Sequence, residues 1–155
     1  MLASMDHGIA ALSPVTVAMV SRSDLEHLRA ERPAISMGLD WMTMVDLATL
    51  RAWITSVGQV RAIERVAHLI CELHQRSINI EQATPTTLPF HLTQIDLGDA
   101  TGQTSVHVNR IVKELRKLNL ASIDRQIVTI FNLDELRELA GFDTSFLHAQ
   151  QLAHK

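Results

Sequence analysis

Hydrophobic residues between positions 104 and 118 recur at helical spacing and divide this segment into two faces. At roughly 100° per residue, one face is an aliphatic stripe of Val108, Ile111, Val112, Leu115 and Leu118. The opposite face carries Val106, Asn109, Arg110, Lys113 and Lys117. The pattern predicts an amphipathic helix over 104–118 that packs on a core through one face and presents the other.

A short helix and a tight turn are predicted directly before this segment. Thr93 and Asp96 have the spacing of a capping box and begin the short helix. Gly98 inside that helix allows a close approach, and Gly102 can adopt the positive φ that a tight turn needs. Thr104 stands where an N-cap is expected. The spacing indicates a helix-turn-helix.

Strand-forming residues follow the second helix. Two β-branched runs, 120–123 and 127–130, are separated by Asp124-Arg125-Gln126, which predicts a β-hairpin with Arg125 at its tip. A hairpin placed directly after such a helix is a wing. A capping signature at 132–135 then predicts a terminal helix over 133–140 that ends at Gly141. Residues 142–155 show no strong pattern, and we expect them to fray.

A long helix is predicted upstream, beginning near Pro33 and broken at Gly58. Its apolar seam repeats every three or four residues and consists of Leu47, Leu50, Ile54 and Val57. So short a seam can pack against a second copy or within its own chain, and both interpretations stay open. Residues 58–61 form the expected hinge to a further helix, which buries Cys71.

The N-terminal pattern predicts strand and then helix. Alternating β-branched residues over 9–20 favour a strand, and Ser23-Asp24-Leu25-Glu26 has the form of a capping box for a helix that ends before Pro33. Residues 77–89 form a polar connection with two prolines, in which we expect a loop and a short strand ending near Phe90.

Composition is that of a globular protein, with 46% hydrophobic and 20% charged residues among 155. No apolar run is long enough to span a membrane and no secretory signal is visible, so we expect a cytoplasmic protein without a membrane partner. The net charge of −3 is unusual for a nucleic-acid binder. However, residues 104–126 carry five basic and two acidic side chains, while residues 1–60 carry four and six.

The sequence contains little evidence for an enzyme active site or a metal site. The eight histidines include no pair four residues apart that would share a helical face, and a single cysteine allows no disulfide. No nucleophile motif or phosphate-binding glycine loop is present. We therefore expect no enzyme activity, no metal site and no cofactor.

The residues facing away from the core suit double-stranded DNA. Near the start of the helix, Ser105, Val106, Asn109 and Arg110 are candidates for reading base edges in the major groove, where Asn pairs with adenine and Arg with guanine. Candidates for phosphate contacts are Thr104, Lys113, Lys117 and Arg125. The alternative interpretation is an ordinary solvated helix face and an exposed loop arginine.

These segments resemble one known family. Thr-Ser-Val-His-Val-Asn-Arg (104–110), Lys-Glu-Leu-Arg (113–116) and Glu64-Arg65-Val66-Ala67-His68-Leu69 are similar to the C-terminal portion of Crp/Fnr transcription regulators, from about Asp6 to Asn132. The resemblance implies a mainly α fold with small β elements, in which a winged helix-turn-helix follows a dimerisation helix and a remnant of a sensory β-roll. It also implies a homodimer on two-fold-symmetric DNA, with RNA polymerase as a possible further partner.

The expected organisation has four parts. Residues 1–32 are a β-roll remnant with a short helix, 33–58 the dimerisation helix, 59–141 the winged domain and 142–155 a tail. The loop that binds cyclic-nucleotide phosphate in the family has no counterpart here, and Leu50-Arg51 replaces the Thr-Ser pair that contacts the purine. We therefore expect no cyclic-AMP binding. An alternative function is a truncated interaction protein that pairs with a full-length regulator or has lost effector control.

Overall fold

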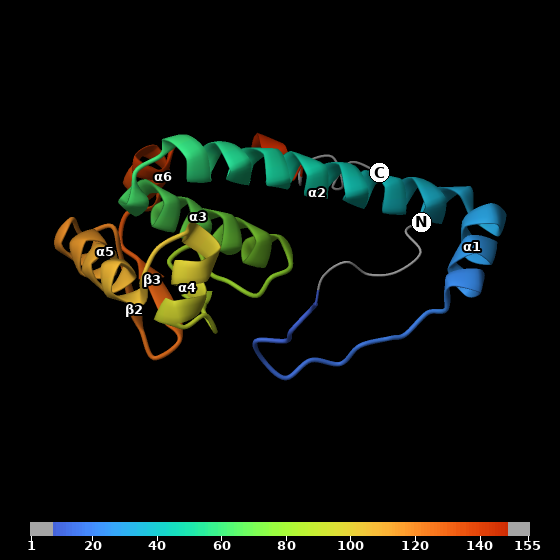
Figure 1. Cartoon of the computed structure of the whole chain (residues 1–155), viewed down its shortest axis with the longest axis horizontal. Coiled ribbons are helices and arrows are strands. Elements are labelled where there is room, and N and C mark those ends of the chain that lie inside the picture. Colours follow the sequence, from blue (N-terminus) through green and yellow to red (C-terminus); the bar gives the residue numbers. More distant parts are fainter. Residues whose placement is uncertain (1–7, 149–155) are drawn as a thin grey trace.

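One long helix organises the molecule. The computed structural model of the protein describes residues 8–148, and α2 (Pro33–Gln59) runs along most of its length (Figure 1). α1 (Arg22–Glu31) packs at one end of α2, and a helical domain lies at the other end. The remaining elements belong to this domain: α3 (Ala62–Asn79), β1 (Thr87–Pro89), α4 (Gln94–Thr101), α5 (Ser105–Lys117), β2 (Ala121–Asp124), β3 (Ile127–Ile130), α6 (Leu133–Ala140) and the 3-10 helix η1 (Thr144–Leu147).

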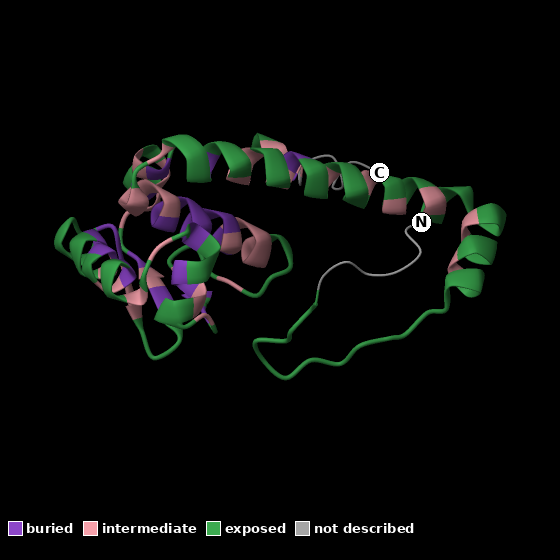
Figure 2. Ribbon diagram, in the orientation of Figure 1, coloured by how far each residue is buried: buried purple, intermediate pink, exposed green. Residues whose placement is uncertain are grey.

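The hydrophobic core lies inside the domain formed by the segments after α2. Its largest fully buried side chains come from α3, α4, α5, α6 and the sheet, and include Ile70, Leu97, Leu115, Val128 and Leu136. Figure 2 shows this concentration of buried residues, with α1 and most of α2 exposed. The domain therefore has its own core, and α2 packs on it from outside.

The three strands form one small antiparallel sheet in the order β1-β3-β2. Thr87 pairs with Thr129, and Asp124 pairs with Ile127 across the hairpin. Arg125 and Gln126 both have positive φ, 47° and 64°, which is the backbone of a type I′ hairpin turn. The predicted wing is confirmed, and β1 adds a third strand to it.

Capping residues set most of the helix ends. Asn132 caps α6 and Gly141 ends it with φ 55°, as predicted. The cap of α1 is Ser21, whose hydroxyl accepts from the backbone N–H of Asp24, so the prediction of a capping box that begins at Ser23 is wrong by two residues. The helix break predicted at Gly58 comes one residue later, since α2 includes Gly58 and ends at Gln59. A single glycine costs a helix only about 1 kcal/mol, so it does not end the helix by itself.

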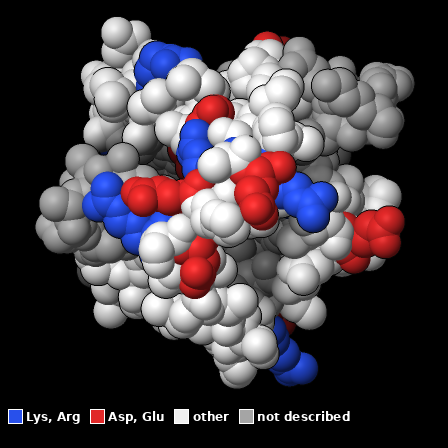
Figure 3. Space-filling view, turned by 90° about the vertical axis from the view of Figure 1, so that its right-hand side faces the viewer, with Lys and Arg blue, Asp and Glu red and all other residues white. Residues whose placement is uncertain are grey.

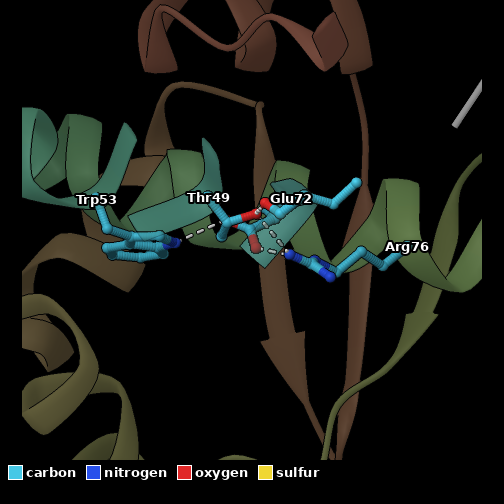
Figure 4. A network of polar contacts seen from close by, with 5 residues as sticks. Thr49, Trp53, Glu72 and Arg76 are labelled. Carbon is cyan, nitrogen blue, oxygen red and sulfur yellow. Dashed lines mark hydrogen bonds and ion pairs between the residues drawn. The ribbon is translucent and has the colours of Figure 1, made fainter. Parts of the chain in front are cut away.

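A polar network joins α2 to α3 (Figure 4). The Trp53 indole N–H donates to one carboxylate oxygen of Glu72 at 2.8 Å, and Arg76 pairs with the other oxygen at 2.9 Å. Arg76 also donates to the Thr49 hydroxyl at 3.2 Å. Glu72 is buried, so these partners satisfy a carboxylate that would otherwise be costly to remove from water. The network fixes α2 against the winged domain.

The segment after α6 packs on α2, so the prediction that the tail frays is wrong for residues 142–148. Phe142 and Leu147 are buried, and the Phe142 and Phe146 rings lie 5.2 Å and 5.8 Å from the His68 ring, between centroids. The driving force is burial of these aromatic and aliphatic side chains against α2 and α3. Residues 149–155 lie outside the described range.

The strand predicted over 9–20 is also wrong. Residues 8–20 contain no strand, and their apolar side chains are exposed, including Val17 and Met19. A strand needs a neighbour to take its backbone hydrogen bonds, and the three strands of the sheet, all between residues 87 and 130, do not extend to this segment. The alternating pattern is therefore present without the pairing that would make it a strand.

Candidate nucleic-acid interface

The helix-turn-helix is formed by α4, the turn at residues 102–104, and α5. A Cβ on Gly98 would lie 2.5 Å from the Gln103 carbonyl oxygen, so this position tolerates no side chain without movement of the turn. Gly102 ends α4 in the left-handed region with φ 66°, which favours glycine. Both glycines thus have the roles that their spacing predicted.

Helix α5 is held to the core by one face. Val108, Ile111 and Leu115 are buried, and the Thr104 hydroxyl accepts from the His107 N–H at 3.3 Å as the N-cap. Val112 is half-buried. Leu118, expected on the same stripe, is exposed because α5 ends at Lys117 and the chain turns there towards the sheet. The predicted helix and its cap are confirmed, apart from this last residue.

The opposite face of α5 is open to solvent. Val106, Arg110, Lys113 and Lys117 are exposed, and Ser105 is half-buried at the first turn. Among residues 8–148, no ion pair engages Arg110, Lys113 or Lys117. These cations therefore remain available to an anionic partner. An exposed helix face with cations free of ion pairs is an arrangement that suits insertion into a groove.

Asn109 differs from its neighbours because it is already hydrogen-bonded. Its side-chain Nδ2 donates to Oε1 of Gln94 at 3.1 Å, which links α5 to the first residue of α4. The sequence alone did not single out Gln94, although its place directly after the predicted cap Thr93 was a usable signal. Gln94 is exposed and lies at the same surface as the α5 face.

Arg125 is at the tip of the wing. Its side chain is 92% exposed, and the nearest carboxylate, that of Asp124, lies 3.9 Å away. An ion pair this long and this exposed contributes little. Arg125 is therefore an exposed cation at the tip of the wing that no close ion pair holds in place.

A second residue that the sequence did not identify fixes the turn to the hinge. Gln103 donates from Nε2 to the Ala62 carbonyl oxygen at 3.1 Å, and Arg65 donates to the carbonyl oxygens of Val57 and Val60. Amide and guanidinium groups here satisfy carbonyls at the end of α2 and the start of α3. The helix-turn-helix is thus anchored to the end of the long helix.

The molecule's end at α1 has a different charge character. Figure 3 views that end and shows basic and acidic side chains intermixed. Arg22 pairs with Glu26, and Arg29 pairs with Asp40. Opposite charges cancel over a short distance here, whereas the exposed residues of α5 include four cations, Arg110, Lys113, Arg116 and Lys117, and one acidic residue, Glu114. An acidic overall charge is compatible with one locally basic surface.

The apolar seam of α2 lies on the surface. Leu47, Leu50, Ile54 and Val57 are 43%, 57%, 73% and 49% exposed. The face of α2 that packs inward carries Ala48, Trp53 and Ser56 instead. Within residues 8–148 the seam is therefore not covered by its own chain.

No three His, Cys, Asp or Glu side chains of residues 8–148 come together in a way that could hold a metal ion. His74 is buried, with its Nε2 2.8 Å from the Thr84 carbonyl oxygen. No helix in this range is long and apolar enough to cross a membrane.

Two helices joined by a glycine turn, followed by a β-hairpin, define a winged helix-turn-helix. Comparison with known proteins agrees, since the Crp-like helix-turn-helix domain matches residues 64–139. Residues 64–139 are therefore a Crp-like helix-turn-helix domain.

Individual relatives support the same assignment. The chain is 24% identical over 142 residues to the transcriptional activator protein FnrL of Cereibacter sphaeroides, covering 89% of this chain and 57% of that protein. It is 26% identical over 126 residues to a probable transcriptional activator of Rhizobium leguminosarum bv. viciae, covering 79% and 51%. The chain thus spans little more than half the length of these relatives.

A solved structure shows the same fold. FixK2 from Bradyrhizobium japonicum superposes with a TM-score of 0.70 at 23% identity, covering 80% of this chain and 61% of that one. The shared portion extends beyond the winged domain, because it is longer than residues 64–139.

Proposed function

We propose that this protein is a sequence-specific transcription regulator that binds double-stranded DNA through α5. The observation that carries the proposal is the exposed face of α5, where the cations Arg110, Lys113 and Lys117 have no ion-pair partner among residues 8–148. The family of the domain supports it, since two relatives are described as transcriptional activators.

The roles divide along the helix. Ser105, Val106, Asn109 and Arg110 lie in the first two turns and are assigned to base edges, with Arg110 donating to guanine and Asn109 pairing with adenine. Lys113 and Lys117 lie further along and are assigned to phosphates, together with Thr104 at the helix start and Arg125 on the wing. The side chains that would position the protein on the DNA backbone thus differ from those that would set its sequence preference.

A homodimer completes the proposed binding unit. The seam of Leu47, Leu50, Ile54 and Val57 is apolar, exposed and on one face of α2, as expected of a helix that packs against its own copy. Two copies related by a two-fold axis would present two α5 helices to a symmetric DNA site. The dimer also doubles the number of phosphate contacts, which offsets the small basic patch of one copy.

The wider setting follows from the family resemblance. We expect such a regulator to work in the cytoplasm and to contact RNA polymerase. The exposed apolar residues of segment 9–20 favour the alternative function, in which the chain pairs with a different regulator. Size measurement of the purified chain, alone and with DNA, distinguishes a homodimer from a monomer that needs another partner.

The experiment for base reading compares two arginines of the same helix. Arg110→Ala should weaken binding to a selected site by about 1–3 kcal/mol, roughly 5- to 150-fold, and relax its sequence preference. Arg116→Ala removes the same charge near the end of α5 and should leave the sequence preference unchanged. Fluorescence anisotropy at fixed salt measures both. Equal sequence preference in wild type and Arg110→Ala contradicts the assignment.

The experiment for the dimer uses the seam. Leu50→Glu places a charge in the proposed apolar interface and should give a monomer in sedimentation velocity, with much weaker DNA binding. Met44→Glu is the matched control, because Met44 is an exposed apolar residue of α2 outside the seam. A Leu50→Glu variant that stays dimeric contradicts this interface.

A further inference from the structure

A hydrogen bond joins the starts of the two helices at the surface proposed to meet DNA. Asn109, in the second turn of α5, donates from Nδ2 to Oε1 of Gln94, the first residue of α4, at 3.1 Å. The two residues lie fifteen positions apart in the chain. The contact therefore depends on the helix-turn-helix fold and is absent from either helix alone.

The chemistry of this contact leaves Asn109 able to read a base. A primary amide has two N–H donors and one carbonyl acceptor. One N–H of Asn109 is given to Gln94, so one N–H and the Oδ1 acceptor remain. Adenine presents one acceptor, N7, and one N6 donor in the major groove, which is the complement of what remains.

We infer that Gln94 is a positioning residue for base selection: it holds the Asn109 amide in the orientation that pairs with adenine. The inference rests on the proposed function. An unrestrained exposed asparagine samples several rotamers and can exchange its donor and acceptor by turning its amide over. The bond to Gln94 removes that freedom before DNA binds, which lowers the cost of forming two hydrogen bonds to one base.

Gln94 is itself well placed to hold another side chain. Thr93 and Asp96 form a reciprocal capping box around the start of α4, and the Thr93 N–H donates to the Asp96 carboxylate at 2.7 Å. The hydrogen bonds from Thr93 hold the pKa of Asp96 below its ordinary value, so this carboxylate stays charged at neutral pH. Leu97 and Thr101 are buried and fix α4 to the core. The acceptor of Gln94 thus extends from a fixed point.

The test selects binding sites for the full chain from a double-stranded DNA pool with about 30 random base pairs, enough for two half-sites one helical turn apart. The base pair whose preference disappears in Asn109→Ala is the one read by residue 109. Gln94→Ala should lower the adenine preference at that same pair by about two- to tenfold, the effect of losing one such hydrogen bond. Preference at the pair read by Arg110 should not change.

Three variants separate positioning from other roles. Gln94→Glu keeps a carbonyl-type acceptor for Asn109, so it should keep the adenine preference while binding all DNA more weakly because of its charge. In the Asn109→Ala background, Gln94→Ala should change no preference. Asn79→Ala is the matched control, since Asn79 is an exposed asparagine that accepts from Gln75 at 2.9 Å on α3.

The outcomes distinguish the inference from the function on which it rests. A wild-type chain that enriches no sequence overturns the proposed function and this inference with it. A wild type with a clear site whose adenine preference survives in Gln94→Ala overturns the inference alone, as does an Asn109→Ala profile equal to that of wild type. Uniformly weaker binding by Gln94→Ala, with the same preferences, also overturns it.

Discussion

Replacing Gly98 with alanine tests whether close approach inside the helix-turn-helix is what this glycine provides. The added Cβ would lie 2.5 Å from the Gln103 carbonyl oxygen and 3.5 Å from the Ser105 backbone nitrogen. Both neighbours are backbone atoms, so no side chain can swing aside to make room. The turn itself must move, which shifts the start of α5.

The expected magnitude is the balance of two effects. Alanine favours a helix over glycine by about 1 kcal/mol. Overpacking at a tight site costs about 1–3 kcal/mol. Gly38→Ala isolates the first effect, because Gly38 lies within α2 and a Cβ there would have nothing within 4 Å. Gly98→Ala should therefore be less stable than Gly38→Ala by about 1–3 kcal/mol.

Urea unfolding followed by far-UV circular dichroism gives the free energies of unfolding of the two variants. DNA affinity measured on the same samples should fall for Gly98→Ala only, since the start of α5 is displaced. Equal stabilisation by the two substitutions would show that the turn has room for a methyl group, and the steric reasoning would be refuted.

Three further predictions concern buried side chains of α3 and their partners. Burial lowers the pKa of His68 below its ordinary 6.5, and the nearby Glu72 opposes the shift. Because the unfolded chain therefore binds this proton at higher pH than the folded protein does, the free energy of unfolding should fall as the pH drops through about 6.5. His68→Phe should flatten this dependence when unfolding is measured at several pH values. Burial raises the pKa of the Cys71 thiol to about 12, so iodoacetamide should modify it in urea and leave it untouched in the native protein; rapid native modification would contradict its burial. Trp53→Phe removes one partner of the buried Glu72 carboxylate and should cost about 1–3 kcal/mol in urea unfolding, whereas an unchanged midpoint would show that the network does not hold α2.

The elements that the sequence predicted are those whose signals are local. The caps Thr93, Thr104 and Asn132 act within one turn of their own helix, and Gly102 and Gly141 end helices by their own backbone freedom. Amphipathic spacing then placed α5 on the core. These features need no knowledge of distant segments.

Apart from small shifts of the helix ends near Ser23 and Gly58, the errors and omissions depend on contacts between distant segments. The pattern over 9–20 has strand character, but a strand forms only where another supplies hydrogen bonds. Phe142 and Phe146 pack because His68 and α2 provide a surface for them. The bond from Asn109 to Gln94 likewise appears only once α4 and α5 are folded together.

The DNA-binding role of α5 is tested most directly by sequencing the sites that the wild-type chain selects from random double-stranded DNA. We predict an inverted repeat whose half-sites lie about 10 base pairs apart or a multiple of it, as a two-fold dimer requires. Recovery of no enriched sequence at moderate salt would contradict sequence-specific binding by α5, and a single asymmetric half-site would contradict the dimer.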